Sequence, residues 1–122
     1  MFKKINRLSK TSDVQRVFAR SRAFFNPLFT VRFSPSQNLS RFTVVVSTKV
    51  SKKAVIRNRI KRVAREFLRL RLKDLLAGDY VVIVKPVAAK KEAAEWRRSL
   101  EDLLNKSRLI VNRPLNNGTM KQ

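Results

Sequence analysis

One segment restricts the fold of this chain more than any other, the stretch AVIRNRIKRVAREFLRLRLK from Ala54 to Lys73. Its large apolar residues recur at intervals of three and four positions, which is the period of an α-helix that buries one side. We therefore expect a helix over about residues 54–76, with Gly78 as the C′ residue just beyond its end. The stripe that would anchor this helix on a sheet consists of Ile56, Ile60, Val63, Phe67 and Leu70.

The opposite side of the predicted helix carries almost only positive charge. Eleven Lys or Arg residues lie between Lys49 and Lys73, together with a single acid, Glu66. An ordinary solvated helix face mixes charges of both signs at i,i+4 spacing, so this face indicates a surface that binds a polyanion. Arginine predominates, and its planar guanidinium suits phosphates and stacks on bases. The face consists of Arg57, Asn58, Lys61, Arg62, Arg65, Arg69 and Lys73, with Arg59 at its edge.

The charge of the whole chain favours the same interpretation. The 122 residues include 29 Lys or Arg and 8 Asp or Glu, which gives a formal net charge of +21. An acidic membrane surface could also attract such a chain, but the apolar runs FTVVV and YVVIV are far too short to span a bilayer. No apolar segment of the secretory type follows the basic N-terminus. We therefore expect a cytoplasmic protein that binds nucleic acid and has no membrane partner.

The residue types that most enzymes use are scarce here. The sequence has no His and no Cys, which removes the commonest general base and the usual zinc ligands. The eight carboxylates are scattered, and the only glycines, Gly78 and Gly118, are too few for a glycine-rich phosphate loop. We expect no catalytic residue and no metal site in this polypeptide alone.

The remaining segments predict one α+β domain. Thr11 and Ser12 are good N-cap residues for a helix over about residues 12–21. The segments LFTVRFS, RFTVVVST and DYVVIVKP are rich in β-branched and aromatic residues and predict strands. The segment AAKKEAAEWRRSLEDLLNKSRL predicts a final helix with Trp96 on its apolar side. The order α-β-β-α-β-α indicates a two-layer α/β sandwich over residues 1–111, followed by a flexible tail over residues 112–122.

The basic segment also resembles a known family. KVSKKAVIRNRIKRVAREFLR is similar to the signature region of the bacterial ribonuclease P protein subunit. In that region a small residue precedes an arginine-asparagine-arginine core by three positions, as Ala54 precedes Arg57, Asn58 and Arg59. The resemblance extends to NRLSKTSDVQRVF near the N-terminus, to GDYVVIVKP and to the final helix with its tryptophan.

The resemblance implies a function. Members of this family bind a large catalytic RNA, and the holoenzyme removes the 5′ leader from precursor tRNA. The RNA carries out the chemistry with magnesium ions, which it holds mainly by itself, and we expect a protein monomer in a 1:1 complex with it. The residues implied in contact with the catalytic RNA are Arg57, Asn58, Arg59, Lys61, Arg62, Arg65 and Arg69.

The resemblance further implies a cleft between the first helix and the sheet that holds the single-stranded leader. Such a site needs stacking platforms and basic flanks. Val14 and Arg32 stand where the family has aromatic residues, and Phe18 is equally compatible with core packing. The family fold also has a left-handed crossover between the second and third of the predicted strands, where the general rule would give a right-handed one. The implied cleft residues are Phe18, Arg32, Lys49, Lys52, Lys53 and Lys85.

Three other functions remain open from the residues alone. A ribosomal or other rRNA-binding protein without a role in cleavage would have the same composition, and only the motif from Ala54 to Arg65 argues against it. A DNA-binding regulator would need a scaffold helix just before the basic helix, where the sequence has the strand FTVVVST. A metal-dependent nuclease would need more carboxylates.

Overall fold

The computed structural model of this chain describes residues 21–35 and 40–110. The predicted first helix, apart from Ser21, and the predicted C-terminal tail lie outside these residues. The described elements are the strands β1 (Arg22–Phe25), β2 (Phe29–Pro35), β3 (Arg41–Val45) and β4 (Gly78–Val84), the helices α2 (Ala54–Leu70) and α3 (Ala93–Lys106), and the 3₁₀ helices η2 (Leu72–Asp74) and η3 (Pro86–Lys90).

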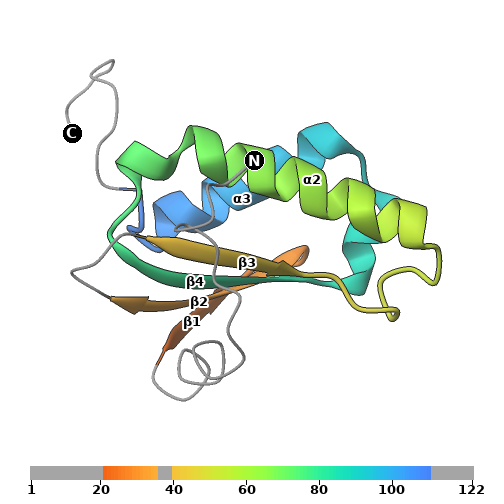
Figure 1. Ribbon diagram of the computed structural model, residues 1–122, viewed down its shortest axis with the longest axis horizontal. Coiled ribbons are helices and arrows are strands. Elements are labelled where there is room, and N and C mark those ends of the chain that lie inside the picture. The colour runs from red at the N-terminus through yellow and green to blue at the C-terminus, as the bar shows by residue number, and fades with distance from the viewer. Residues whose placement is uncertain (1–20, 36–39, 111–122) are drawn as a thin grey trace.

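The four strands form one sheet with the order β1-β2-β4-β3. β4 pairs with β2 in antiparallel and with β3 in parallel orientation. Because adjacent parallel strands need a crossover between them, α2 connects β3 to β4 over one face of the sheet, and α3 lies beside α2 on the same face (Figure 1). The two-layer α+β class and the βαβ crossover expected from the sequence are thereby confirmed.

The structure adds a strand that the sequence analysis did not predict. β1 has only four residues and pairs only with β2, at the edge of the sheet. Its connection to β2 turns at Asn26, whose side-chain oxygen accepts hydrogen bonds from the backbone N–H groups of Leu28, at 3.0 Å, and Phe29, at 2.8 Å. The Asn26 amide also donates to Ser99 in α3. This turn therefore depends on a tertiary contact as well as on local sequence.

The predicted end of the basic helix was wrong. α2 ends at Leu70, and Gly78 is the first residue of β4 rather than a helix cap. A Cβ atom at this position would lie 2.5 Å from both the Phe33 ring and the Ser34 carbonyl oxygen. Glycine is needed here because β2 approaches so closely.

Two other boundaries differ from the predictions. β4 ends at Val84, the 3₁₀ helix η3 begins at Pro86, and α3 begins only at Ala93. Proline suits the first position of a helical turn because it has no N–H group to donate. The Trp96 indole N–H donates to the carbonyl oxygen of Ala88 at 2.8 Å, which joins this turn to α3.

The core lies between the helices and the helix-facing side of the sheet. Tyr80 in the central strand packs between Phe33 of β2 and Phe42 of β3, with ring centroids 4.8 and 4.9 Å apart. Its hydroxyl group donates to the carbonyl oxygen of Leu76. Trp96, Leu100, Leu103 and Leu104 of α3 are buried, as the sequence predicted for the apolar side of the last helix. α2 contributes Ile60, Ala64, Phe67 and Leu68.

The buried side of α2 is rotated slightly from the predicted stripe. Leu70 is 61% exposed, whereas Ala64 and Leu68 are 1% and 0% exposed. α2 packs on the sheet and also on α3. Its buried side therefore includes Ala64 and Leu68, which the spacing of the large apolar residues did not predict.

Burial raises the pKa of the Tyr80 hydroxyl well above its ordinary value. The unfolded chain releases this proton above about pH 10, whereas the folded protein keeps it, so we expect stability to fall above that pH by up to about 1.4 kcal/mol per pH unit. Tyr80→Phe removes this component and also the hydrogen bond to Leu76. Urea unfolding of both proteins from about pH 8 to about pH 11 tests this. The variant should be less stable at the lower pH, and the difference should shrink above pH 10; a constant difference would contradict the prediction.

Candidate nucleic-acid interface

The exposed side of α2 presents the predicted basic face. Asn58, Arg59, Arg62 and Arg69 are exposed, and Arg57, Lys61 and Arg65 are half-buried. The first turn of the helix contains no acid. The positive end of the helix dipole therefore adds to the charge of the side chains there.

Few of these cations are neutralised within the protein. Glu66 is the only acid on α2, and its carboxylate forms an ion pair with Arg69. The hydrogen bond from Arg69 lowers the pKa of Glu66 below its ordinary value. Asn58, Lys61, Arg62 and Arg65 form no side-chain hydrogen bond or ion pair with the described part of the chain. Their polar groups are available to an external anion.

Two other arginines of the face are held by protein contacts. Arg57 donates from its guanidinium group to the Ser51 carbonyl oxygen at 2.9 Å. The Arg59 guanidinium lies 5.8 Å from the centre of the Trp96 ring in α3, within the range of a cation–π interaction. These contacts fix the positions of both side chains and leave their positive charges unneutralised.

The fold brings the second group of predicted residues close to the first. Because β3 and β4 are parallel, the loop after β3 and the residue after β4 lie at the same end of the sheet, where α2 also begins (Figure 1). Lys49, Lys52 and Lys53 are exposed in that loop. Lys85 follows β4 directly. Four of the predicted cleft lysines therefore lie at the end of the sheet where the basic helix starts.

An exposed aromatic residue that the sequence analysis missed lies next to one of these lysines. Phe25, the last residue of β1, is 66% exposed, and the Lys85 Nζ atom lies 5.1 Å from its ring centre. Recognition of the strand β1 would have been needed to find it. Once β1 is known, the pairing of Phe25 with Thr30 places the Phe25 ring on the side of the sheet turned away from α2 and α3.

We call the side of the sheet turned away from α2 and α3 the distal sheet face. The register places one row of residues across all four strands on it: Phe25, Thr30, Ile83 and Val45. The next row consists of Ala23, Arg32, Val81 and Thr43.

Arg32 is the predicted cleft residue in the middle of this face. It is half-buried, and its guanidinium lies 3.4 Å from the Ser21 hydroxyl oxygen. Phe18, the other predicted contact for the leader, lies outside the described residues.

At the far end of the face, Arg41 forms two hydrogen bonds with the buried Asp79 carboxylate, at 3.0 and 2.8 Å. The only acid in the sheet is thus paired with a cation.

The described residues show neither a metal cluster nor a membrane span. No group of three or more His, Cys, Asp or Glu side chains within residues 21–35 and 40–110 is arranged to hold a metal ion. None of the helices over the same residues is long and apolar enough to cross a bilayer. The arrangement can bind an extended anion by charge, hydrogen bonding and stacking.

A family comparison identifies the chain. The model of the family described as Ribonuclease P matches residues 2–108 of the sequence. This chain belongs to the ribonuclease P protein family. The resemblance carried by the segment around Arg57, Asn58 and Arg59 is thereby confirmed.

Individual members of the family agree over most of their length. The ribonuclease P protein component of Staphylococcus carnosus is 34% identical over 113 residues, which cover 90% of this chain and 96% of the relative. The component of Bacillus pumilus is 36% identical over 115 residues, with coverage of 92% and 96%. The solved structure of the Staphylococcus aureus RNase P protein matches with a TM-score of 0.81 at 29% identity, over 86% of this chain and 97% of that one.

The unpaired side chain of Arg62 leads to a prediction about RNA binding by this chain. Arg62→Ala should weaken binding to a bacterial ribonuclease P RNA and make the plot of log K against log salt shallower by about 0.7–0.9, because one phosphate contact is lost. Lys106→Ala, which removes the same charge from the last turn of α3, is the control. Filter binding at a series of salt concentrations measures both slopes; an unchanged slope for Arg62→Ala would show that this side chain contacts no phosphate.

Proposed function

We propose that this chain binds the catalytic RNA of ribonuclease P through the basic face of α2 and the 5′ leader of precursor tRNA on the distal sheet face. It would thereby promote the endonucleolytic cut that gives the mature 5′ end of tRNA. The observation that carries the proposal is the charge of α2. The helix has one acid, which is already paired with Arg69, and three cations with free polar groups, Lys61, Arg62 and Arg65. Such a surface is stabilised when phosphates neutralise it.

The distal sheet face supports the part of the proposal that concerns the leader. A single strand of RNA is bound by aromatic rings that stack on bases and by cations that contact the backbone. Phe25 offers an exposed ring, Lys85 lies over that ring, and Arg32 adds a second cation one row away. The lysines of the loop after β3 extend the positive charge from this face to the start of α2.

The chemistry is assigned to the RNA partner. The described part of the protein supplies cations and hydrogen-bond donors but no cluster of carboxylates for a divalent ion. The phosphates of a folded RNA supply the hard oxygen ligands that magnesium prefers. We propose that the magnesium ions are held mainly by the RNA, and that the protein contributes by neutralising repulsion between RNA strands that must approach each other. A 1:1 complex in the cytoplasm is part of the same proposal.

Reconstitution of cleavage tests the function directly. A 5′-labelled precursor tRNA is incubated at low magnesium with the protein alone, with a bacterial ribonuclease P RNA alone, and with both. We expect cleavage at the mature 5′ end only in the combined sample, or much faster cleavage there, because the protein's charge replaces part of the screening by magnesium. Tight binding to the RNA without faster cleavage would instead support an rRNA-binding protein.

The position of Phe25 gives a prediction specific to the leader. Phe25→Ala should weaken binding of precursor tRNA to the reconstituted holoenzyme by about 1–3 kcal/mol, the usual contribution of one base stacked on an aromatic ring. Binding of mature tRNA, which has no leader, is the control and should not change. Fluorescence anisotropy with the two labelled tRNAs measures both affinities. An equal loss for both would assign Phe25 to the tRNA body or to folding.

A further inference from the structure

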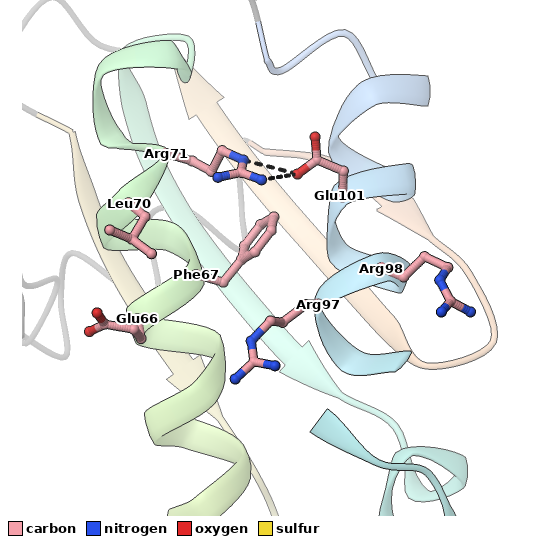
Figure 2. Close-up of a pocket in the computed structure, with 7 residues that line it drawn as sticks. All are labelled: Glu66, Phe67, Leu70, Arg71, Arg97, Arg98 and Glu101. Atoms are coloured by element: carbon pink, nitrogen blue, oxygen red, sulfur yellow. Dashed lines mark hydrogen bonds and ion pairs between the residues drawn. The ribbon is translucent and has the colours of Figure 1, made fainter. Parts of the chain in front are cut away.

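A groove separates α2 from α3 on the helix side of the molecule, and the proposed function does not use it. Its volume is about 350 Å³. Figure 2 shows Phe67 between the two helices, with the Arg71–Glu101 pair above it. Leu70 on α2 and Arg97 on α3 line the same space.

The acids of the groove are already neutralised. The Arg71 guanidinium pairs with the Glu101 carboxylate at 2.9 Å and lies 4.8 Å from the centre of the Phe67 ring. Glu66 pairs with Arg69. The Arg71 contacts join the two helices. Because both acids are in ion pairs, neither repels an anion strongly.

Two groove cations, Arg97 and Arg98, have no such contact, and they differ in direction. Arg97 is exposed and forms no hydrogen bond, ion pair or ring contact with the described residues. Figure 2 shows its guanidinium group extending from α3 toward α2, whereas the adjacent Arg98 points away from α2. Leu70 is 61% exposed on α2. A free guanidinium and an exposed apolar side chain therefore line one groove.

We propose that this groove is a nucleotide-binding site, in which Arg97 contacts a phosphate and Leu70 contacts the base or ribose of the same RNA strand. A nucleotide unites an anion with a flat, weakly polar body, and this pair of side chains matches both parts. The site continues the basic face, since Arg62 and Arg69 lie on the adjacent exposed side of α2. The inference rests on the proposed function, and it extends the footprint of the RNA from α2 to α3.

An RNA strand fits this surface better than an acidic protein segment does. The groove adjoins a helix face whose unpaired cations are Lys61, Arg62 and Arg65, and the one acid of that helix is paired with Arg69. Successive phosphates can contact such a row at regular spacing, and each contact releases a counterion. An acidic protein partner at the groove is a separate outcome of the test below.

The neighbouring arginines Arg97 and Arg98 provide a matched pair of variants. Arg97→Ala and Arg98→Ala remove the same charge from the same helix. Both residues line the groove, but only the Arg97 guanidinium extends toward α2. Binding of each variant to an in vitro transcribed bacterial ribonuclease P RNA is measured over a series of salt concentrations. Arg97→Ala should make the salt slope shallower by about 0.7–0.9 and Arg98→Ala should leave it unchanged. Equal slopes for the two variants, changed or unchanged, would overturn the proposal.

A neutral substitution tests the apolar half of the site. Leu70→Ala keeps the charge and the helix propensity, and its exposed side chain contributes little to the core. It should weaken RNA binding about threefold to tenfold with an unchanged salt slope, because apolar contact area is lost without a phosphate contact. Unchanged affinity would overturn the assignment of the base or ribose to this position.

Arg62→Ala separates failure of this inference from failure of the proposed function. If Arg62→Ala lowers the salt slope and Arg97→Ala does not, the RNA binds α2 alone and the groove is overturned as an RNA site, which leaves it open to a protein partner. If neither variant changes the slope, neither Arg62 nor Arg97 contacts a phosphate, and the proposed RNA contact of α2 fails at Arg62 together with the inference. Thermal unfolding of each variant confirms that the fold is retained.

Discussion

The packing of Tyr80 between Phe33 and Phe42 determines how the rest of the molecule is assembled. These three rings join the central strand to both of its neighbours, and α2 packs on the same side of the sheet. Since β3 and β4 are parallel, the chain must return over the sheet between them. α2 is that return, and its place over the sheet follows from the pairing of the strands rather than from its own helix propensity.

This topology explains how residues distant in sequence meet at one end of the sheet. Phe25 ends β1, Lys85 follows β4, and the lysine-rich loop follows β3. The parallel pair places the last two at the same end, and the antiparallel order of the first two strands places Phe25 there as well. Residues that end or follow three different strands therefore place an exposed aromatic ring and several lysines at the end of the sheet where α2 starts.

The periodicity of the sequence was sufficient for the elements that bury one side. The spacing of Ile60 and Phe67 predicted α2, and β-branched runs predicted the longer strands. Tertiary contacts decided the rest. β1 is too short to show a period, Gly78 is required by the approach of β2 rather than by a helix end, and Leu70 continues the apolar spacing but lies outside the core.

The candidate site was predictable to a similar extent. Charge counting found the basic face of α2, because an excess of one sign along a helix is visible without coordinates. The sequence does not show which of Arg97 and Arg98 faces α2. Adjacent residues of a helix point in different directions, and the direction toward α2 is known only from the packing of the two helices. The place of Phe25 likewise required the register of β1.

The unpaired cations of α2 make ionic strength act in two opposite directions on this protein. In the free protein Lys61, Arg62 and Arg65 repel one another, so added salt screens the repulsion and stabilises the fold. In the proposed complex the same side chains would contact phosphates, and added salt would weaken those contacts by competition from counterions. On the proposed function, binding of RNA would neutralise the charges that repel one another in the free protein, so it would also raise the free energy of unfolding.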